Sequence, residues 1–192
     1  MSRKFSVDWF TNNIPIWTHI LGPMMGQGNV RGLEIGAFEG LSTCWLMDHV
    51  FTNPTSHLDV VDTFQGSTEH KGLGVDTSHL YETFLANTSE FKDHMSSFRM
   101  TSQHFLLHCC RPMYDFIYVD GDHHAWSCLE DMVLSWSRLK VYGIMIIDDY
   151  GGGEPGSRGS ELVKTAVDGF MASYESKYNI LHKKYQVILQ KI

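Results

Sequence analysis

Short apolar runs alternate with amphipathic stretches along most of this chain. The apolar runs predict strands at 33–36, 58–61, 98–100, 114–119, 143–147 and 185–191. Apolar positions spaced by three or four residues predict helices at 41–50, 80–95, 124–139 and 161–178. Unbroken apolar strands that alternate with helices are typical of a largely parallel sheet with both faces covered. Because ligands bind outside the carboxyl ends of such strands, we expect function in the polar residues that follow each strand.

The first thirty residues carry apolar side chains at a helical spacing that Pro15 interrupts. We interpret residues 1–30 as a helical cap segment and residues 31–192 as the core of a single domain. Two polar or glycine-rich stretches, at 65–78 and 151–159, fit no helix or strand, and the first is a candidate mobile lid. Together with the cap segment, these loops are expected to form the pocket for a small ligand.

Composition narrows the class of protein. The 192 residues are 43% hydrophobic, which is enough for one compact core. A formal net charge of −7 lacks the basic footprint of a nucleic-acid-binding protein. No run approaches the roughly 18 apolar residues of a membrane span, and no signal peptide is recognisable, so we expect a cytoplasmic protein. The four cysteines form no C-x-x-C pair and are expected to be reduced and mostly buried.

The first two predicted strands end in residues that suit a nucleoside ligand. Gly36 and Gly40 allow close backbone approach, and the helix that follows can meet an anion such as a carboxylate or phosphate. An ordinary strand-to-helix turn is the alternative, and the spacing is not the G-x-G-x-x-G of dinucleotide sites. Asp62, which ends the second strand, can accept hydrogen bonds from both ribose hydroxyls, although aspartate also terminates strands without any ligand.

Acidic residues gather after two later strands. Asp120 and Asp122 follow the strand at 114–119, and Asp148 and Asp149 follow the strand at 143–147. If these strands are neighbours about 4.8 Å apart, Asp120, Asp148 and Asp149 can converge on one cation. Oxygen ligands without thiolates favour Mg²⁺, with Mn²⁺ or Ca²⁺ as alternatives. Helix capping and solvated turns are the competing interpretation. Of the eleven histidines, only His123 and His124 adjoin this cluster.

These segments resemble class I S-adenosylmethionine-dependent methyltransferases, in particular the small family that contains metal-dependent sugar O-methyltransferases. Residues 34–43 are similar to its first motif. Its second block, with the paired aspartates, is similar to residues 115–123, 129–131, 139–140, 143 and 146–150, and residues 163–170 resemble the helix that follows. The resemblance covers roughly residues 31–192. It implies a single-domain, Rossmann-like α/β fold with a mostly parallel seven-stranded sheet.

The resemblance also assigns roles to particular residues. Those expected to bind the cofactor are Glu34, Gly36, Ala37, Gly40 and Ser42 near its methionine part, Asp62 on the ribose, and Thr101 and Ser102 near the adenine. Asp120, Asp148 and Asp149 correspond to metal ligands, with Mg²⁺ or Mn²⁺ as the ion. Asp122 corresponds to a general base or cofactor contact, with His123 as the other catalytic candidate. His124-Ala125 replaces the family's Ser-Tyr, which leaves open which histidine assists Asp122.

The resemblance therefore implies a metal-dependent O-methyltransferase that acts on a sugar, either a monosaccharide or a glycan terminus. A catechol-like acceptor is the nearest alternative. A nucleotide-dependent oxidoreductase, a metal hydroxylase, or a binding protein that has lost turnover are further ones. Trp9, Trp17 and Trp126 are candidates to stack on a sugar face, although packing is the commoner role of tryptophan. A homodimer formed through Trp9, Phe10 and Trp17 is a further hypothesis.

Overall fold

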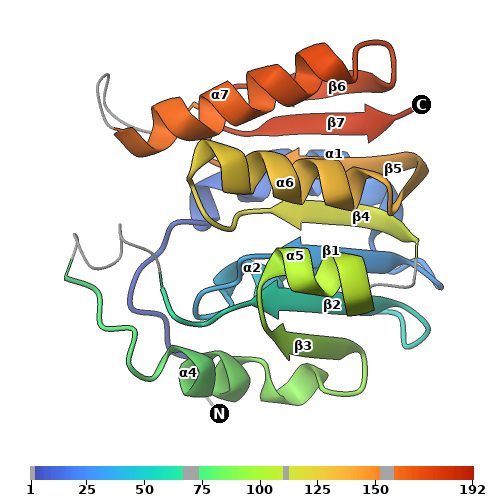
Figure 1. The fold of residues 1–192 in the computed structure, drawn as a ribbon. Helices are drawn as coiled ribbons and strands as arrows, with labels where there is room; N and C mark the ends of the chain where they lie inside the picture. The colour runs from blue at the N-terminus through green and yellow to red at the C-terminus, as the bar shows by residue number, and fades with distance from the viewer. Residues whose placement is uncertain (1–2, 67–73, 110–112, 152–157) are drawn as a thin grey trace.

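The computed structural model describes residues 3–66, 74–109, 113–151 and 158–192, with side chains from residue 162 in the last range. Within these residues the chain forms one seven-stranded sheet of order β3-β2-β1-β4-β5-β7-β6 (Figure 1). The strands are β1 (Arg31–Ile35), β2 (His57–Asp62), β3 (Met95–Arg99), β4 (Tyr114–Val119), β5 (Leu139–Ile147), β6 (Tyr178–Lys183) and β7 (Val187–Lys191). The α-helices are α1 (Ile14–Leu21), α2 (Leu41–His49), α4 (Leu80–Asn87), α5 (Ser102–His104), α6 (Ala125–Trp136) and α7 (Arg158–Ser173).

Parallel pairing brings the carboxyl ends of the strands to one edge of the sheet. Strands β3, β2, β1, β4 and β5 are parallel, and β7 runs antiparallel to both β5 and β6. Ile35 at the end of β1 is in register with Val61 and Val119, and Val119 is in register with Ile147. The predicted Rossmann-like fold, with a mostly parallel seven-stranded sheet, is confirmed. The turns after β1, β2, β4 and β5 consequently lie side by side.

Helices cover both faces of the sheet, as the unbroken apolar strands predict (Figure 1). Helices α6 and α7 pack on one face through Met132, Trp136 and Phe170. Helices α1 and α2 pack on the other through Trp17 and Leu46. Burial of these large side chains removes apolar area from water, at about 25 cal/mol per Å². The sheet is thereby fixed between two layers, and the site residues at its edge stand on a rigid support.

The structure differs from several of the predicted elements. The helix expected over 124–139 ends at Trp136, and β5 begins at Leu139. The helix expected over 80–95 ends at Asn87, because a 3-10 turn at Ser89–Phe91 leads directly into β3. The helix expected over 161–178 ends at Ser173, and β6 follows it. Pro15 does not interrupt the N-terminal helix but lies in the first turn of α1, where a missing backbone N–H leaves no hydrogen bond unmade.

The N-terminal segment packs into the core of the domain. Phe10 is 5% exposed and Trp17 is fully buried, with edge contacts from Trp17 to Trp45 and Tyr118. The expectation that Phe10 and Trp17 are exposed and available to a second subunit is therefore wrong, because their rings are already covered by this chain. The dimer itself stays a prediction.

Other expectations concern the chain as a whole. Cys44 and Cys128 are buried free thiols and Cys109 is exposed, whereas Cys110 lies outside the described residues. No helix in the described part of the chain is long and apolar enough to cross a bilayer. Half of the predicted lid, residues 67–73, and most of the glycine loop, residues 152–157, also lie outside the described residues.

Candidate active site

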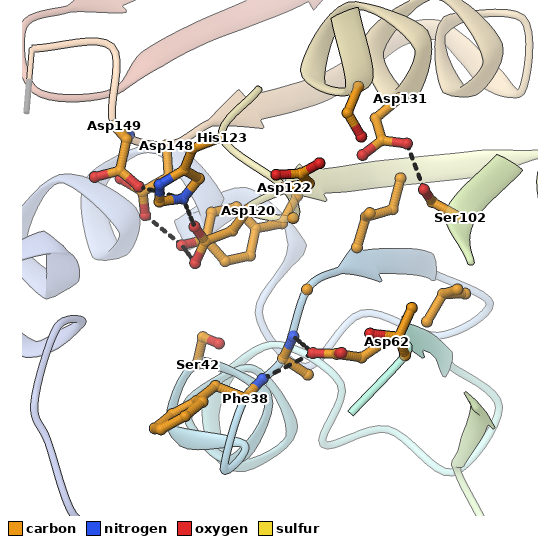
Figure 2. A pocket seen from close by; sticks show the side chains of 18 of the residues that line it. Phe38, Ser42, Asp62, Ser102, Asp120, Asp122, His123, Asp131, Asp148 and Asp149 are labelled. Carbon is orange, nitrogen blue, oxygen red and sulfur yellow. Dashed lines mark hydrogen bonds and ion pairs between the residues drawn. The ribbon is translucent and has the colours of Figure 1, made fainter. Parts of the chain in front are cut away.

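A cavity of about 650 Å³ opens at the carboxyl edge of the sheet, where the turns after β1, β2, β4 and β5 meet. Figure 2 shows Asp62 on one side, Ser102 and Asp131 on a second, and Asp120, His123, Asp148 and Asp149 on a third. Most of the predicted site residues line it: Gly36, Ala37, Ser42, Asp62, Thr101, Ser102, Asp120, Asp122, His123, Asp148 and Asp149. Glu34 and Gly40 are not among its lining residues.

Gly36 allows the turn after β1 to lie against the end of β4. Its φ of 83° is in the left-handed region, and a Cβ built there would lie 1.9 Å from the backbone oxygen of Asp120. The Asp120 N–H donates to the carbonyl of Ile35 at 2.8 Å, so the two strand ends are joined just beneath the pocket. Only glycine fits this position without moving the backbone.

Asp62 fixes the shape of the glycine turn. Its Oδ2 accepts hydrogen bonds from the backbone N–H groups of Ala37 at 2.8 Å and Phe38 at 3.0 Å (Figure 2). Its Oδ1 accepts from the N–H of Phe64 at 2.7 Å. Each carboxylate oxygen offers more than one lone pair, so these bonds leave acceptor capacity toward the pocket. The ribose contact stays a prediction, and the structure adds an organising role for the same carboxylate.

Glu34 lies beneath the pocket rather than on its wall. The side chain is fully buried, and the hydroxyls of Ser42 and Thr43 donate to its two oxygens, the latter at 2.6 Å. Burial raises the pKa of Glu34 to about 7, although the two hydroxyls oppose this shift. Gly40, with a φ of 86°, is the N-cap of α2 and packs against Phe84. Both residues therefore position the start of α2.

The far end of the pocket carries a polar pair, and one of its members, Asp131, was given no role in the site from the sequence. The Ser102 hydroxyl donates to Asp131 Oδ1 at 2.5 Å, and Thr101 caps the short helix α5 by accepting from the N–H of His104. Asp131 is 1% exposed, and burial raises the pKa of this carboxyl to about 7. A buried acid that lines the pocket beside Ser102 is suited to recognise a polar ligand group.

Asp120, His123 and Asp149 come together on the opposite wall. His123 Nε2 lies 3.0 Å from Asp149 Oδ2 and 3.9 Å from Asp120 Oδ1 (Figure 2). One donor atom from each residue can be chosen so that all lie within 4.8 Å of one another. Asp149 reaches this position through a left-handed backbone conformation with φ of 57°, which aspartate tolerates better than most residues.

Two tyrosines hold the carboxylates of this group, and neither was identified as a site residue from the sequence. The Tyr185 hydroxyl donates to Asp149 Oδ1 at 2.5 Å. The Tyr118 hydroxyl lies 2.8 Å from Asp120 Oδ2 and also contacts Asp148 Oδ2. Asp120 and Asp149 thus each have one oxygen occupied by a phenol, while the other oxygen faces His123.

The predicted ligand Asp148 is oriented differently from its neighbours. It is 7% exposed, and its Oδ2 accepts from Gln186 Nε2 at 3.0 Å while its Oδ1 accepts from the N–H of Asp149. Gln186 is in turn held by Trp17 Nε1, which donates to its amide oxygen at 2.8 Å. The structure therefore brings Asp120, His123 and Asp149 into one group, and Asp148 lies beside it with both oxygens engaged.

The closely spaced charges on this wall shift the pKa values of Asp148, Asp149 and His123. Burial, reinforced by the charges of Asp120 and Asp149, raises the pKa of Asp148 above its ordinary value. Burial opposes ionisation of Asp149 as well, but the contact with His123 lowers its pKa below the ordinary range. Burial disfavours the imidazolium form of His123, yet the flanking carboxylates outweigh this and raise its pKa. A positive charge is thus stabilised at the centre of the group.

Asp122 and His124 form a second pair, closer to solvent. His124 Nδ1 lies 2.7 Å from Asp122 Oδ1, and their side chains are 51% and 43% exposed. Both residues line the pocket. Of the two histidines left open by the sequence analysis, His124 is therefore the one paired with Asp122.

The tryptophans predicted to stack on a ligand separate into two groups. Trp17 is fully buried, so the prediction that it stacks on a sugar is wrong. Trp9 and Trp126 line the pocket and are 47% and 63% exposed. Trp9 packs against Phe38 with ring centroids 5.2 Å apart.

Comparisons with known proteins agree with this architecture. A family model described as "Methyltransferase domain" matches residues 33–150. No curated protein matches the sequence. Among solved structures, the O-methyltransferase from Bacillus cereus in complex with SAH is 14% identical with a TM-score of 0.62, over 100% of this chain and 84% of that chain. The O-methyltransferase NovP is 18% identical with a TM-score of 0.65, over 94% and 78% of the two chains. At these identities the solved structures establish the fold alone.

Proposed function

Because this chain belongs to the family of methyltransferase domains, we propose that it transfers the methyl group of S-adenosylmethionine to a hydroxyl of a sugar with the help of a divalent cation. The observation that carries the proposal is the position of the Asp120, His123 and Asp149 group across one cavity from the glycine turn and Asp62. A nucleoside cofactor and a cation-held acceptor can meet in that cavity.

The lining of the pocket fits the cofactor. The turn at Gly36 has no room for a side chain, and Gly36 lines the cavity. Asp62 ends β2 with acceptor capacity for ribose hydroxyls. Ser102 and the buried Asp131 offer hydrogen-bonding groups at the far end, which suits the polar edge of an adenine.

The opposite wall fits a divalent cation. Asp120 and Asp149 each turn one oxygen into the group, and Asp148 adds a third carboxyl beside it. Carboxylates so close together are costly to ionise unless a cation is present. Carboxylate oxygens are suitable ligands for Mg²⁺ and Mn²⁺.

When bound, S-adenosylmethionine supplies an electrophilic methyl group and the cation supplies Lewis acidity toward acceptor oxygens. The protein must then hold the acceptor hydroxyl in line with the methyl group and remove its proton. Alignment contributes about 7–11 kcal/mol when the reactants are held near attack geometry. Asp122 accepts the proton, and His124 Nδ1 at 2.7 Å steadies that carboxylate. A positioned base contributes roughly 10²–10⁴-fold.

The side chains at the mouth of the pocket suit a sugar. Trp9 and Trp126 present apolar ring surface beside carboxylates, a combination that suits the apolar face and the hydroxyls of a sugar. A net charge of −7 opposes the approach of a nucleic acid backbone. A catechol would use the same cation, so a comparison of catechols with sugars as acceptors tests this choice.

The proposal is tested with purified protein, S-adenosylmethionine and Mg²⁺. Calorimetry should detect binding of S-adenosylhomocysteine, and mass spectrometry should detect the gain of one methyl group on a member of a monosaccharide panel. EDTA and Asp149→Ala should each abolish this gain. Asp93→Ala is the matched control, because Asp93 is exposed and lies outside the pocket.

Three results would contradict parts of the proposal. Methylation that survives EDTA and Asp149→Ala would remove the cation from the mechanism. Methylation of catechols but of no sugar would replace the acceptor. Thermal stabilisation by NAD(P)H and not by S-adenosylhomocysteine would favour an oxidoreductase on the same fold.

A further inference from the structure

We propose that Asn87 is a positioning residue for the cofactor, because its side chain holds the N-terminal arm, residues 3–10, against the pocket. The arm closes one side of the pocket while it is held there, and S-adenosylmethionine enters and leaves when the arm lifts. This inference rests on the cofactor binding proposed above and adds the residue that controls its rate. Asn87 was given no role from the sequence.

The N-terminal arm runs along the carboxyl edge of the sheet and leads into α1 (Figure 1). None of its residues belongs to a helix or strand. Trp9 packs on Phe38 of the glycine turn, with ring centroids 5.2 Å apart, and both residues line the pocket. Val7 and Phe10 line it as well. The end of the arm therefore forms part of the pocket wall, although it precedes the α/β core in the sequence.

Asn87 joins the start of the arm to the glycine turn. It is the last residue of α4 and is 4% exposed. Its Oδ1 accepts from the N–H of Lys4 at 2.8 Å, and its Nδ2 donates to the carbonyls of Lys4 at 2.8 Å and Glu39 at 2.9 Å. An amide that both accepts from and donates to one residue's backbone pairs with it much as a neighbouring strand does. One buried side chain thus connects the arm, α4 and the turn that is expected to meet the cofactor.

Further polar contacts of the arm lie nearer the surface. The Arg3 guanidinium donates to Asp48 Oδ2 at 2.5 Å and to Glu90 Oε1 at 2.6 Å, and these two acidic side chains are 38% and 61% exposed. The N–H of Ser6 donates to Glu39 Oε2 at 2.5 Å. Exposed ion pairs contribute little and are weakened further by salt. Asn87 therefore supplies the buried part of the attachment, and Arg3 supplies a part that depends on ionic strength.

The two ends of the arm differ in how firmly they are attached. Phe10 is 5% exposed and packs edge-on against Trp17, with ring centroids 4.9 Å apart, so this end stays with the core. Toward the start of the arm, every second side chain is exposed: Lys4, Ser6 and Asp8. Segments with few buried contacts open locally at a lower free energy than the core does. The arm can therefore lift from its start and open one side of the pocket while Phe10 stays in place.

A ligand in the pocket favours the closed arm, because a ligand stabilises the state to which it binds more tightly. The competing explanation is that Asn87 only stabilises the fold. The two explanations differ in what a variant changes. Loss of a residue that holds the arm closed speeds the departure of the ligand, whereas loss of a purely structural contact lowers thermal stability and leaves the dissociation rate of the ligand unchanged.

The experiment measures the dissociation of S-adenosylhomocysteine from the full chain by stopped-flow tryptophan fluorescence. Asn87→Ala removes three hydrogen bonds and should raise the dissociation rate at least about 10-fold. Arg3→Ala leaves the buried amide in place and should raise the rate about 3-fold. For the unmodified chain, the rate should rise when NaCl is increased from about 0.05 M to about 0.5 M, and Arg3→Ala should remove most of this dependence.

Two matched controls and a test without variants accompany these rates. Asn179→Ala and Lys92→Ala should leave the rate unchanged, because both residues are exposed and lie outside the arm and the pocket. Trypsin cleaves after Arg3 and Lys4, and intact-mass measurement follows this cleavage. Because proteolysis follows the population of the opened segment, saturating S-adenosylhomocysteine should make cleavage of the unmodified chain at these two sites several-fold slower.

Each outcome decides the matter. Unchanged dissociation rates in Asn87→Ala and Arg3→Ala overturn the proposal, as does tryptic cleavage of the arm that S-adenosylhomocysteine does not slow. If Asn87→Ala fails to fold, Arg3→Ala, the salt dependence and the proteolysis decide in its place. Failure of the unmodified chain to bind S-adenosylhomocysteine overturns the cofactor proposal together with this inference, whereas binding with unchanged rates in the variants overturns this inference alone.

Discussion

Replacing Glu34 with glutamine should change how the stability of the protein depends on pH. The Glu34 carboxyl is fully buried, and its pKa is raised from the ordinary 4.5 to about 7. Between pH 4.5 and about pH 7, Glu34 therefore keeps its proton in the folded protein and releases it in the unfolded chain. Stability falls as pH rises through this window, because the unfolded state is the one that ionises freely.

The magnitude follows from the size of the shift. A difference of about 2.5 pKa units corresponds to about 3 kcal/mol at 1.36 kcal/mol per unit. Most of this loss develops between about pH 5 and about pH 8. Glutamine cannot ionise, and its amide can still pair with the hydroxyls of Ser42 and Thr43. The difference in unfolding free energy between Glu34→Gln and the wild type should therefore rise by about 2.5 kcal/mol over that range.

The measurement is urea unfolding of both proteins at several pH values, followed by tryptophan fluorescence. Glu175→Gln is the control, because Glu175 is exposed in the turn before β6, and its difference from the wild type should be independent of pH. A difference for Glu34→Gln that stays flat from pH 5 to pH 8 would refute the reasoning. It would mean that Glu34 is ionised throughout, with its charge satisfied by the two hydroxyls.

Two more predictions concern the walls of the pocket. Gly36→Ala should destabilise the protein by about 3 kcal/mol or more and abolish binding of S-adenosylhomocysteine, because a methyl group there meets a backbone carbonyl at 1.9 Å and the φ is positive; thermal unfolding and calorimetry check both effects. Ser102→Ala should cost about 2 kcal/mol near pH 8, where Asp131, with a pKa of about 7, is ionised, and about 1 kcal/mol near pH 5.5, where it is neutral; equal losses at both pH values in urea unfolding would contradict this.

The parallel part of the sheet was predictable because its signal is local. Each of its central strands is a run of apolar residues, and the aspartates that follow them stand at the carboxyl edge whatever the rest of the chain does. Strand β6 gave no such signal, because it is an edge strand with Ile180 and Leu181 exposed and its side chains do not alternate between core and solvent. Tyr185 and Gln186 were missed as a consequence, since their place in the site depends on the turn between β6 and β7.

Asp131 was not predicted as a site residue, although the sequence did contain a signal for that role. In α6 the buried positions include Cys128, Asp131, Met132 and Ser135, which follow one another at helical spacing. An acid on the apolar face of an amphipathic helix is either paired or functional, because burying a lone carboxylate is costly. The spacing of buried positions along this helix therefore indicated Asp131. Its hydrogen bond with Ser102, a residue that was predicted to bind the cofactor, could not be derived, because Ser102 comes from a different element.

The directions of Asp148 and Asp149 could not have been derived from their order in the sequence. Successive side chains along a strand point to opposite faces, so two adjacent aspartates at a strand end are expected to diverge. Asp149 departs from this pattern because its backbone adopts a φ of 57°, and its carboxylate lies toward His123. Asp148 instead accepts a hydrogen bond from Gln186. The grouping of Asp149 with His123 and Asp120 thus depends on a backbone torsion that the order of residues in the sequence does not give.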